Sequence, residues 1–177
     1  MDMCRGCKAD CCYSFSIPLS IADAYLLVQN GRGKLVRFIK AGRKADSFRA
    51  GLSYYKMELA RRPTGECALL EYDGLGRCTI EEYKPAVCRA YPMHRPHPNA
   101  PAALLSTRAC GAGRRPSVED IAELESCLKD YEREWALHRE LVARWNKSLL
   151  SYIPWAPLFM HVWCALISLW VARAKRQ

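Results

Sequence analysis

The sequence predicts a mainly α-helical chain with a small, irregular, cysteine-rich β-hairpin region, a metal-stabilised single domain plus C-terminal helices. Three observations predict this fold class: a capped apolar segment at residues 20–29, a long amphipathic pattern at 117–146, and cysteines clustered in the first half of the chain. We expect a cysteine-cluster metal-binding domain over residues 1–115 and a C-terminal helical region over residues 116–177.

The first expected helix has a clear start. The hydroxyl of Ser20 can accept the backbone N–H of Asp23, which is a capping box, and the helix should run through about residue 29. A second short helix is expected over residues 34–41, where apolar side chains fall on one face and basic ones elsewhere.

The next stretch predicts β-structure and turns. Residues 53–59 fit either a strand or a helical turn, because their alternation is poor. Residues 67–72 and 77–80 flank an Asp-Gly turn and predict a small hairpin. Six prolines between positions 85 and 116 predict a rigid, irregular segment.

The second half of the chain predicts two helices. Ser117 and Asp120 form another capping box, which opens the longest amphipathic helix, ending near residue 146. Residues 149–172 carry no charged side chain and precede a basic cluster, which is also typical of a membrane helix. Prolines interrupt that stretch, and its unbroken part spans about 22 Å, less than a ~30 Å hydrocarbon core. We therefore favour a buried or partner-facing helix, with membrane association as the alternative.

Composition narrows the class of protein. The chain has 177 residues, 50% of them apolar and 25% charged, which is typical of a folded domain. Residues 31–62 hold ten Lys or Arg but only two acidic residues, within a chain whose net charge is +9. Such a stretch could meet phosphate, an anionic lipid surface or an acidic protein. We favour a solvated face, and we consider nucleic acid an improbable partner.

Ten cysteines are the most informative residues in the sequence. The N-terminus has no apolar leader, so we expect a cytoplasmic protein, in which clustered cysteines are more often metal ligands than disulfides. Glycines beside several cysteines allow backbone N–H groups to approach sulfur, and Arg77 and Arg89 add positive charge that favours thiolates. Eight cysteines are therefore candidate metal ligands: Cys4, Cys7, Cys11, Cys12, Cys67, Cys78, Cys88 and Cys110.

These cysteines carry a resemblance to a known family. Their order, with the block Lys84-Pro-Ala-Val-Cys88-Arg-Ala-Tyr-Pro92, resembles the YkgJ-like CxxCxxCC cysteine-cluster family of zinc- or iron-chelating domains over about residues 1–111. Two departures are visible: the second spacer of the opening cluster has three residues rather than two, and Lys84 stands where the family usually has Arg. The resemblance implies metal binding but no agreed reaction. A related domain occurs in flagellin lysine N-methylases, where an iron–sulfur cluster is implicated.

The number of thiols bears on the metal. Eight thiolates exceed one tetrahedral zinc site, and the neighbouring side chains of Cys11 and Cys12 are expected to point apart, so both binding one small ion is awkward. We therefore expect an iron–sulfur cluster first, with zinc as the alternative cofactor. His94 and His97 are expected on the surface, and Cys127 and His138 as ordinary helix positions.

Two functions remain open from the sequence. The first is a cytosolic iron–sulfur protein for electron transfer, redox sensing or a cluster-dependent modification, which would allow an oxidoreductase-like activity. The second is a zinc-stabilised interaction module without catalysis, with a protein partner at the C-terminal helices. No nucleophile elbow, phosphate-binding loop or dinucleotide fingerprint is present, so no catalytic residue is identified.

Overall fold

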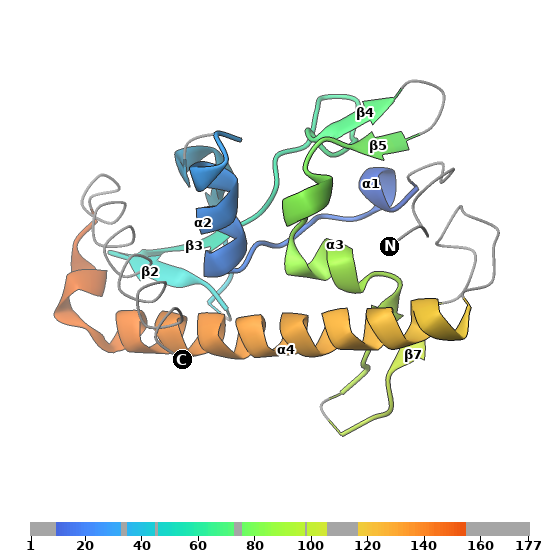
Figure 1. The fold of residues 1–177 in the computed structure, drawn as a ribbon. Helices are drawn as coiled ribbons and strands as arrows, with labels where there is room; N and C mark the ends of the chain where they lie inside the picture. The colour runs from blue at the N-terminus through green and yellow to red at the C-terminus, as the bar shows by residue number, and fades with distance from the viewer. Residues whose placement is uncertain are drawn as a thin grey trace. The chain divides into compact units, whose positions relative to one another are not determined.

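The computed structural model divides the chain into two compact units (Figure 1). It describes residues 10–32, 35–44, 46–72, 76–97, 99–105 and 117–154. Unit 1 consists of Met1–Ile17 and Leu59–Arg133, and unit 2 consists of Pro18–Glu58 and Glu134–Gln177. The boundary expected between residues 115 and 116 lies outside the described residues and stays a prediction.

Unit 2 begins with the predicted capped helix, α2 (Ile21–Gln29). The backbone N–H of Asp23 donates to Ser20 Oγ at 3.1 Å, and the Ser20 N–H donates to an Asp23 carboxylate oxygen at 2.9 Å. Both residues are buried, so these bonds satisfy polar groups that water cannot reach. The capping box is confirmed.

A three-stranded antiparallel sheet follows, and it corrects one prediction. Its strands β1 (Ile39–Ala41), β2 (Phe48–Ala50) and β3 (Ser53–Met57) lie in the order β1-β3-β2, after the 3-10 helix η1 (Leu35–Phe38). The helix expected over residues 34–41 is wrong, because residues 39–41 pair with β3. Backbone bonding to a distant strand outweighs the local helical pattern there.

The second half of the longest helix completes unit 2. In α4 (Val118–Lys147), Val142 and Trp145 are buried, like Phe48 of the sheet. The Asn146 side chain accepts the Arg49 N–H at 2.8 Å and donates to the Ser47 carbonyl at 2.9 Å. Trp145 Nε1 donates to the Arg49 carbonyl at 2.7 Å, so side chains of α4 form hydrogen bonds with the backbone of β2. The 3-10 helix η4 (Leu149–Tyr152) then follows.

Unit 1 is built from short elements. In chain order they are α1 (Asp10–Ser14), β4 (Leu70–Tyr72), β5 (Gly76–Cys78), the 3-10 helix η2 (Glu81–Tyr83), α3 (Ala86–Ala90), β6 (Met93–His94) and β7 (Ala103–Leu104). Strands β4 and β5 pair antiparallel, which confirms the predicted hairpin, and β6 pairs with β7. Figure 1 shows α1 beside the β4–β5 hairpin.

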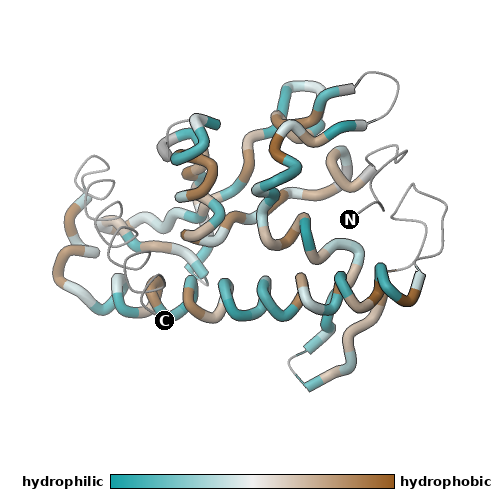
Figure 2. The backbone as a smooth tube through the Cα atoms, viewed as in Figure 1, coloured by the Kyte–Doolittle hydropathy of each residue, from teal (hydrophilic) through white to brown (hydrophobic). Residues whose placement is uncertain are grey.

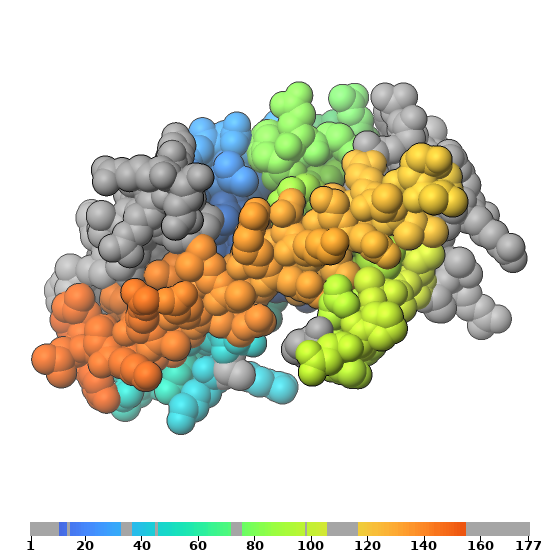
Figure 3. Space-filling view, turned by 60° about the horizontal axis from the view of Figure 1, so that its bottom comes forward, coloured from blue at the N-terminus to red at the C-terminus, as the bar shows by residue number. Residues whose placement is uncertain are grey.

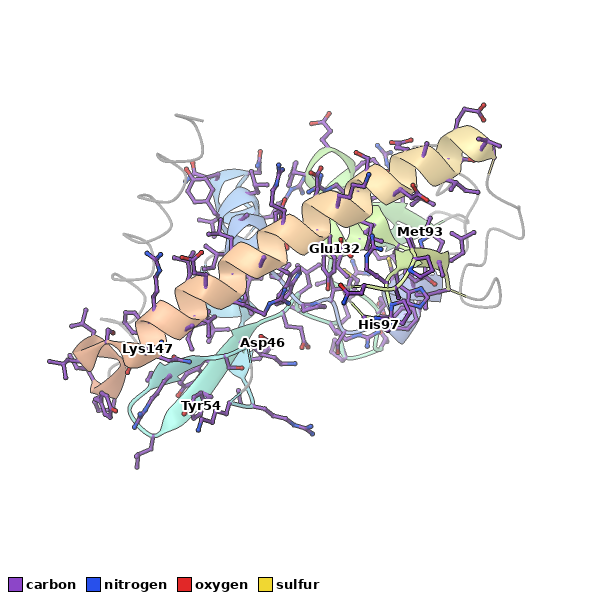
Figure 4. All side chains as sticks on the ribbon, turned by 90° about the horizontal axis from the view of Figure 1, so that it is seen from below. Asp46, Tyr54, Met93, His97, Glu132 and Lys147 are labelled. Carbon is purple, nitrogen blue, oxygen red and sulfur yellow. The ribbon has the colours of Figure 1, made fainter. Side chains whose placement is uncertain are left out.

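The first half of α4 packs on this unit. Its predicted capping box is present, because the Asp120 N–H donates to Ser117 Oγ at 3.1 Å and the Ser117 N–H donates back at 2.9 Å. Leu124 and Leu128 of α4 form a buried cluster with Ala90 and Met93. Glu132 forms an ion pair of 2.6 Å with Arg95, beside the β6–β7 hairpin (Figure 4).

The fold class is therefore mixed rather than mainly α. Three small antiparallel sheets accompany the helices in the described part of the chain. Their strands hold two to five residues, too few for a reliable period-two pattern, which is why most were not predicted. Polar residues recur all along α4 (Figure 2). Among the described helices, none combines the length and the apolar character needed to cross a lipid bilayer. The expected C-terminal helix falls largely on residues 155–177, outside the described residues.

Candidate metal site

Two candidate thiols lie on the first helix of unit 1. Cys11 and Cys12 are consecutive in α1 and half-buried. Their side chains were expected to point apart, but they share a hydrogen bond. Consecutive positions on a helix differ by about 100° of rotation, so two sulfurs there can still meet on one flank. Adjacent cysteines can thus present two donors to one place.

The thiols of Cys11 and Cys12 have pKa values shifted in opposite directions. The hydrogen bond from Cys12 lowers the pKa of the Cys11 thiol to about 7, helped by backbone N–H groups and by the cation of Lys84. The same contact with Cys11 raises the pKa of Cys12, with burial and the nearby thiols of Cys67 and Cys88 acting in the same direction. The contact therefore favours the thiolate of Cys11, the form that binds metals.

Cys67 is brought to this helix by backbone bonds. It is buried, and its N–H donates to the Cys12 carbonyl at 2.8 Å. Burial raises the pKa of the Cys67 thiol, while the backbone N–H of Leu69 and the cations of Arg61 and Arg62 oppose that rise. Residues separated by more than fifty positions thus meet at α1.

Cys78 and Cys88 enter from two further elements. Cys78 ends β5, opposite Leu70, and burial raises the pKa of its thiol, while the Ile80 N–H and Lys84 oppose that rise. Its thiol interacts with that of Cys67. Cys88 is half-buried in α3, and its charge raises the pKa of the Cys12 thiol. Five thiols from four segments therefore interact in unit 1.

Three cations that the sequence did not indicate lie near these sulfurs. Lys84, Arg61 and Arg62 lower the pKa values of Cys11 or Cys67. The guanidinium of Arg61 also donates to the Tyr13 carbonyl, just after Cys12. Arg89 lowers the pKa of Cys127 of α4, which is raised chiefly by burial. Lys84 lies within the proline-flanked cysteine block, the one signal that could have identified it.

The histidines near Cys88 stay apart from the thiols. His97 is exposed, and its position at the β6–β7 hairpin is visible in Figure 4. His94 is half-buried, with Nδ1 2.9 Å from the Ala103 carbonyl oxygen. Both fit the surface role expected of them rather than that of ligands.

Five of the eight candidate ligands lie within the described residues. Cys4, Cys7 and Cys110 lie outside the described residues. In the described ranges, no three His, Cys, Asp or Glu residues stand close enough to hold a metal ion between them. The donor chemistry nevertheless fits a thiophilic metal, because the described donors are thiols with nearby cations and backbone N–H groups.

Comparison with known proteins decides the family. A family model described as "CxxCxxCC: Putative zinc- or iron-chelating domain" matches residues 3–111, well over half of the chain. The chain belongs to this family. No curated protein and no solved structure matches it. The CxxCxxCC match contains all eight candidate cysteines and ends before α4. It supports metal binding, by zinc or iron, as the property of unit 1's cysteine-rich part.

Proposed function

We propose that this CxxCxxCC protein holds an iron–sulfur cluster through its clustered cysteines and serves electron transfer, redox sensing or a cluster-dependent modification. The observation that supports this best is a series of pairwise electrostatic interactions that links five thiols: Cys12 with Cys11, Cys67 and Cys88, and Cys67 with Cys78. With Cys4, Cys7 and Cys110 included, the thiols exceed the four that one zinc ion takes.

The surroundings of the sulfurs also support a charged centre. Backbone N–H groups of Leu69 and Ile80 bond to Cys67 and Cys78. Such bonds, with nearby cations, stabilise the negative charge of thiolates and tune the potential of a cluster. When bound, a cluster would supply one-electron redox chemistry. The chain's own residues would hold it, exclude water with the buried Cys67, and offset its charge with Lys84, Arg61 and Arg62.

A structural zinc site is the second candidate. The observation that favours it is that the thiols join α1, the β4–β5 hairpin and α3, elements of three to five residues that bury few large side chains. A zinc ion can contribute on the order of 10 kcal/mol to folding, which would suit a protein-interaction module without catalysis. For either metal we propose a reducing, cytoplasmic location, because free thiols in this number would be oxidised elsewhere.

Metal analysis of the purified protein separates the two. The full-length chain is purified without oxygen, and iron, acid-labile sulfide and zinc are measured per chain. We expect a coloured sample with iron and sulfide in comparable amounts. A colourless sample with stoichiometric zinc would instead establish the structural site. A sample that contains no metal, even after reconstitution with iron and sulfide or with zinc, would refute both.

A further inference from the structure

One end of unit 2 exposes large apolar side chains on two turns. Leu52, in the β2–β3 turn, is 95% exposed, and Leu149, the first residue of η4, is 86% exposed. Leu150 and Tyr152 of η4 are also exposed. We call these four residues the apolar end. Figure 2 shows hydrophobic residues where the chain turns after α4. Large apolar side chains that gather on one part of a surface are typical of an interaction site.

The two turns are held together by specific bonds. The Gly51 N–H donates to the Ser151 carbonyl at 2.9 Å. Arg49 Nε donates to the Gly51 carbonyl at 2.9 Å, and its guanidinium lies 4.0 Å from the centroid of the Tyr152 ring. Gly51 has φ +62, and an added Cβ would meet Pro154 at 3.0 Å, so the close approach depends on glycine. Figure 3 shows η4 next to the sheet. These contacts therefore hold the two turns of the apolar end in a defined arrangement.

Basic side chains lie on the same sheet and directly before η4. In the sheet, Lys40 pairs directly with Lys56 and Arg49 with Tyr54, while Ile39, Phe48 and Met57 occupy the alternate, core-facing positions. The outer face thus carries three cations and a tyrosine. Exposed Arg43 and Lys44 follow β1, and exposed Lys147 precedes η4 (Figure 4). Lys56 is ion-paired with Glu58, so the charge that this part of unit 2 offers to an anionic neighbour comes from Lys40, Arg43, Lys44 and Lys147.

We propose that the apolar end of unit 2 and its basic rim dock on an anionic lipid surface. Such a surface offers both complements at once: negatively charged headgroups for Lys40, Arg43, Lys44 and Lys147, and an apolar layer for Leu52 and Leu149. A nucleic acid or acidic peptide would use the cations and leave the leucines in water. An apolar protein partner would leave these exposed cations without a counter-charge. Tyr152, under Arg49, has the amphipathic character of interfacial aromatics.

The sequence after the apolar end is consistent with this docking. The uncharged stretch that begins at Leu149 continues to residue 172 and is followed by Arg173, Lys175 and Arg176. The docking rests on unit 2 alone and does not depend on which metal the cysteines bind.

Vesicle binding by the full-length protein tests the proposal. The protein is mixed with vesicles of phosphatidylcholine alone or of phosphatidylcholine with roughly 30% phosphatidylglycerol, which imitates a strongly anionic leaflet. The vesicles are then sedimented, and the bound protein is measured. We expect binding to the anionic vesicles that falls as salt rises, and much weaker binding to neutral ones. The double variant Leu52→Ser/Leu149→Ser should lower the partition coefficient roughly tenfold, because two leucines no longer enter the apolar layer.

A matched control removes an equally exposed apolar side chain elsewhere. Val118, at the start of α4 in unit 1, is 79% exposed, and Val118→Ser should leave vesicle binding unchanged. If the double variant binds as tightly as the unaltered chain, the contact is made elsewhere, for instance by residues 155–177, and the proposal is wrong. Equal binding to neutral and anionic vesicles would overturn the role of the basic rim.

A charge reversal gives a second, independent readout. Lys40→Glu places an acidic side chain opposite Lys56, which is already paired with Glu58, so the thermal midpoint should change little. The same variant should weaken binding to anionic vesicles severalfold, because it adds a negative charge to the rim. A variant whose midpoint is maintained and whose vesicle binding is unchanged would contradict the docking surface.

Discussion

Replacement of His138 in unit 2 should remove much of the acid sensitivity of the fold. This histidine is 3% exposed, and its ring lies against Trp135 and Phe48, with centroid separations of 4.7 Å and 5.6 Å. Its Nδ1 has no hydrogen-bond partner among the described residues. Burial lowers the pKa of His138 from 6.5 to about 4, although the carbonyl and charge of Asp46 act in the opposite direction.

The sign of the effect follows from proton binding. Because the folded pKa lies below the unfolded one, the unfolded chain binds a proton first as pH falls, so the stability that neutral His138 contributes is present above pH 6.5 and lost towards pH 4. At about 1.36 kcal/mol per pH unit, a fall from 6.5 to about 4 corresponds to about 3 kcal/mol.

Denaturation by urea between pH 7.5 and 4.5 measures this loss. The variant His138→Gln keeps an amide that can donate to the Asp46 carbonyl but cannot titrate. We expect the stability difference between the unaltered chain and the variant to shrink as pH falls, by roughly 2 kcal/mol across that range. Comparison of the two proteins at each pH cancels contributions from carboxylates and from any bound metal. Parallel stability curves for the two proteins would refute the reasoning.

Three further predictions concern the metal site and the helix contacts. Cys67→Ser and Cys88→Ser should each lose most of the bound metal, measured by elemental analysis, whereas Cys127→Ser should keep it; equal loss from all three would contradict the ligand assignment. Asn146→Ala leaves the Arg49 N–H and the Ser47 carbonyl without their side-chain partner and should cost about 2 kcal/mol in chemical denaturation, against little change for exposed Arg144→Ala. Ser117→Ala removes the cap of α4 and should cost about 1 kcal/mol; Ser117→Asp, which restores an acceptor, should recover most of it.

The helices α2 and α4 were predictable because their start signals are local. The capping boxes at Ser20 and Ser117 use hydrogen bonds between residues three apart, which a sequence shows directly. The β4–β5 hairpin likewise has its turn between its strands. Strand β1 was missed because its partner, β3, lies beyond a third strand-forming segment, and no local pattern indicates that pairing.

The candidate metal site was likewise predictable only in part. Which residues are thiols, and that they would act together, follow from the spacing of the cysteines. The hydrogen bond from the Cys67 N–H to the Cys12 carbonyl, and the effect of Lys84 on Cys11, depend on how separate segments meet. Charge placement around a site is a tertiary property, and neighbours in the sequence are a poor guide to it.

The order of segments in unit 1 has a consequence for synthesis. Residues 18–58 are inserted between the two pieces of that unit, and the ends of the insertion are joined by the Leu59 N–H to the Ile17 carbonyl at 3.0 Å. Cys67 follows Cys12 by 55 residues. At about 5–20 residues per second, the thiols of α1 leave the ribosome about 3–11 seconds before Cys67 does. A nascent chain of this kind depends on a reducing environment, or on early delivery of metal, to reach Cys67 with Cys11 and Cys12 still as thiols.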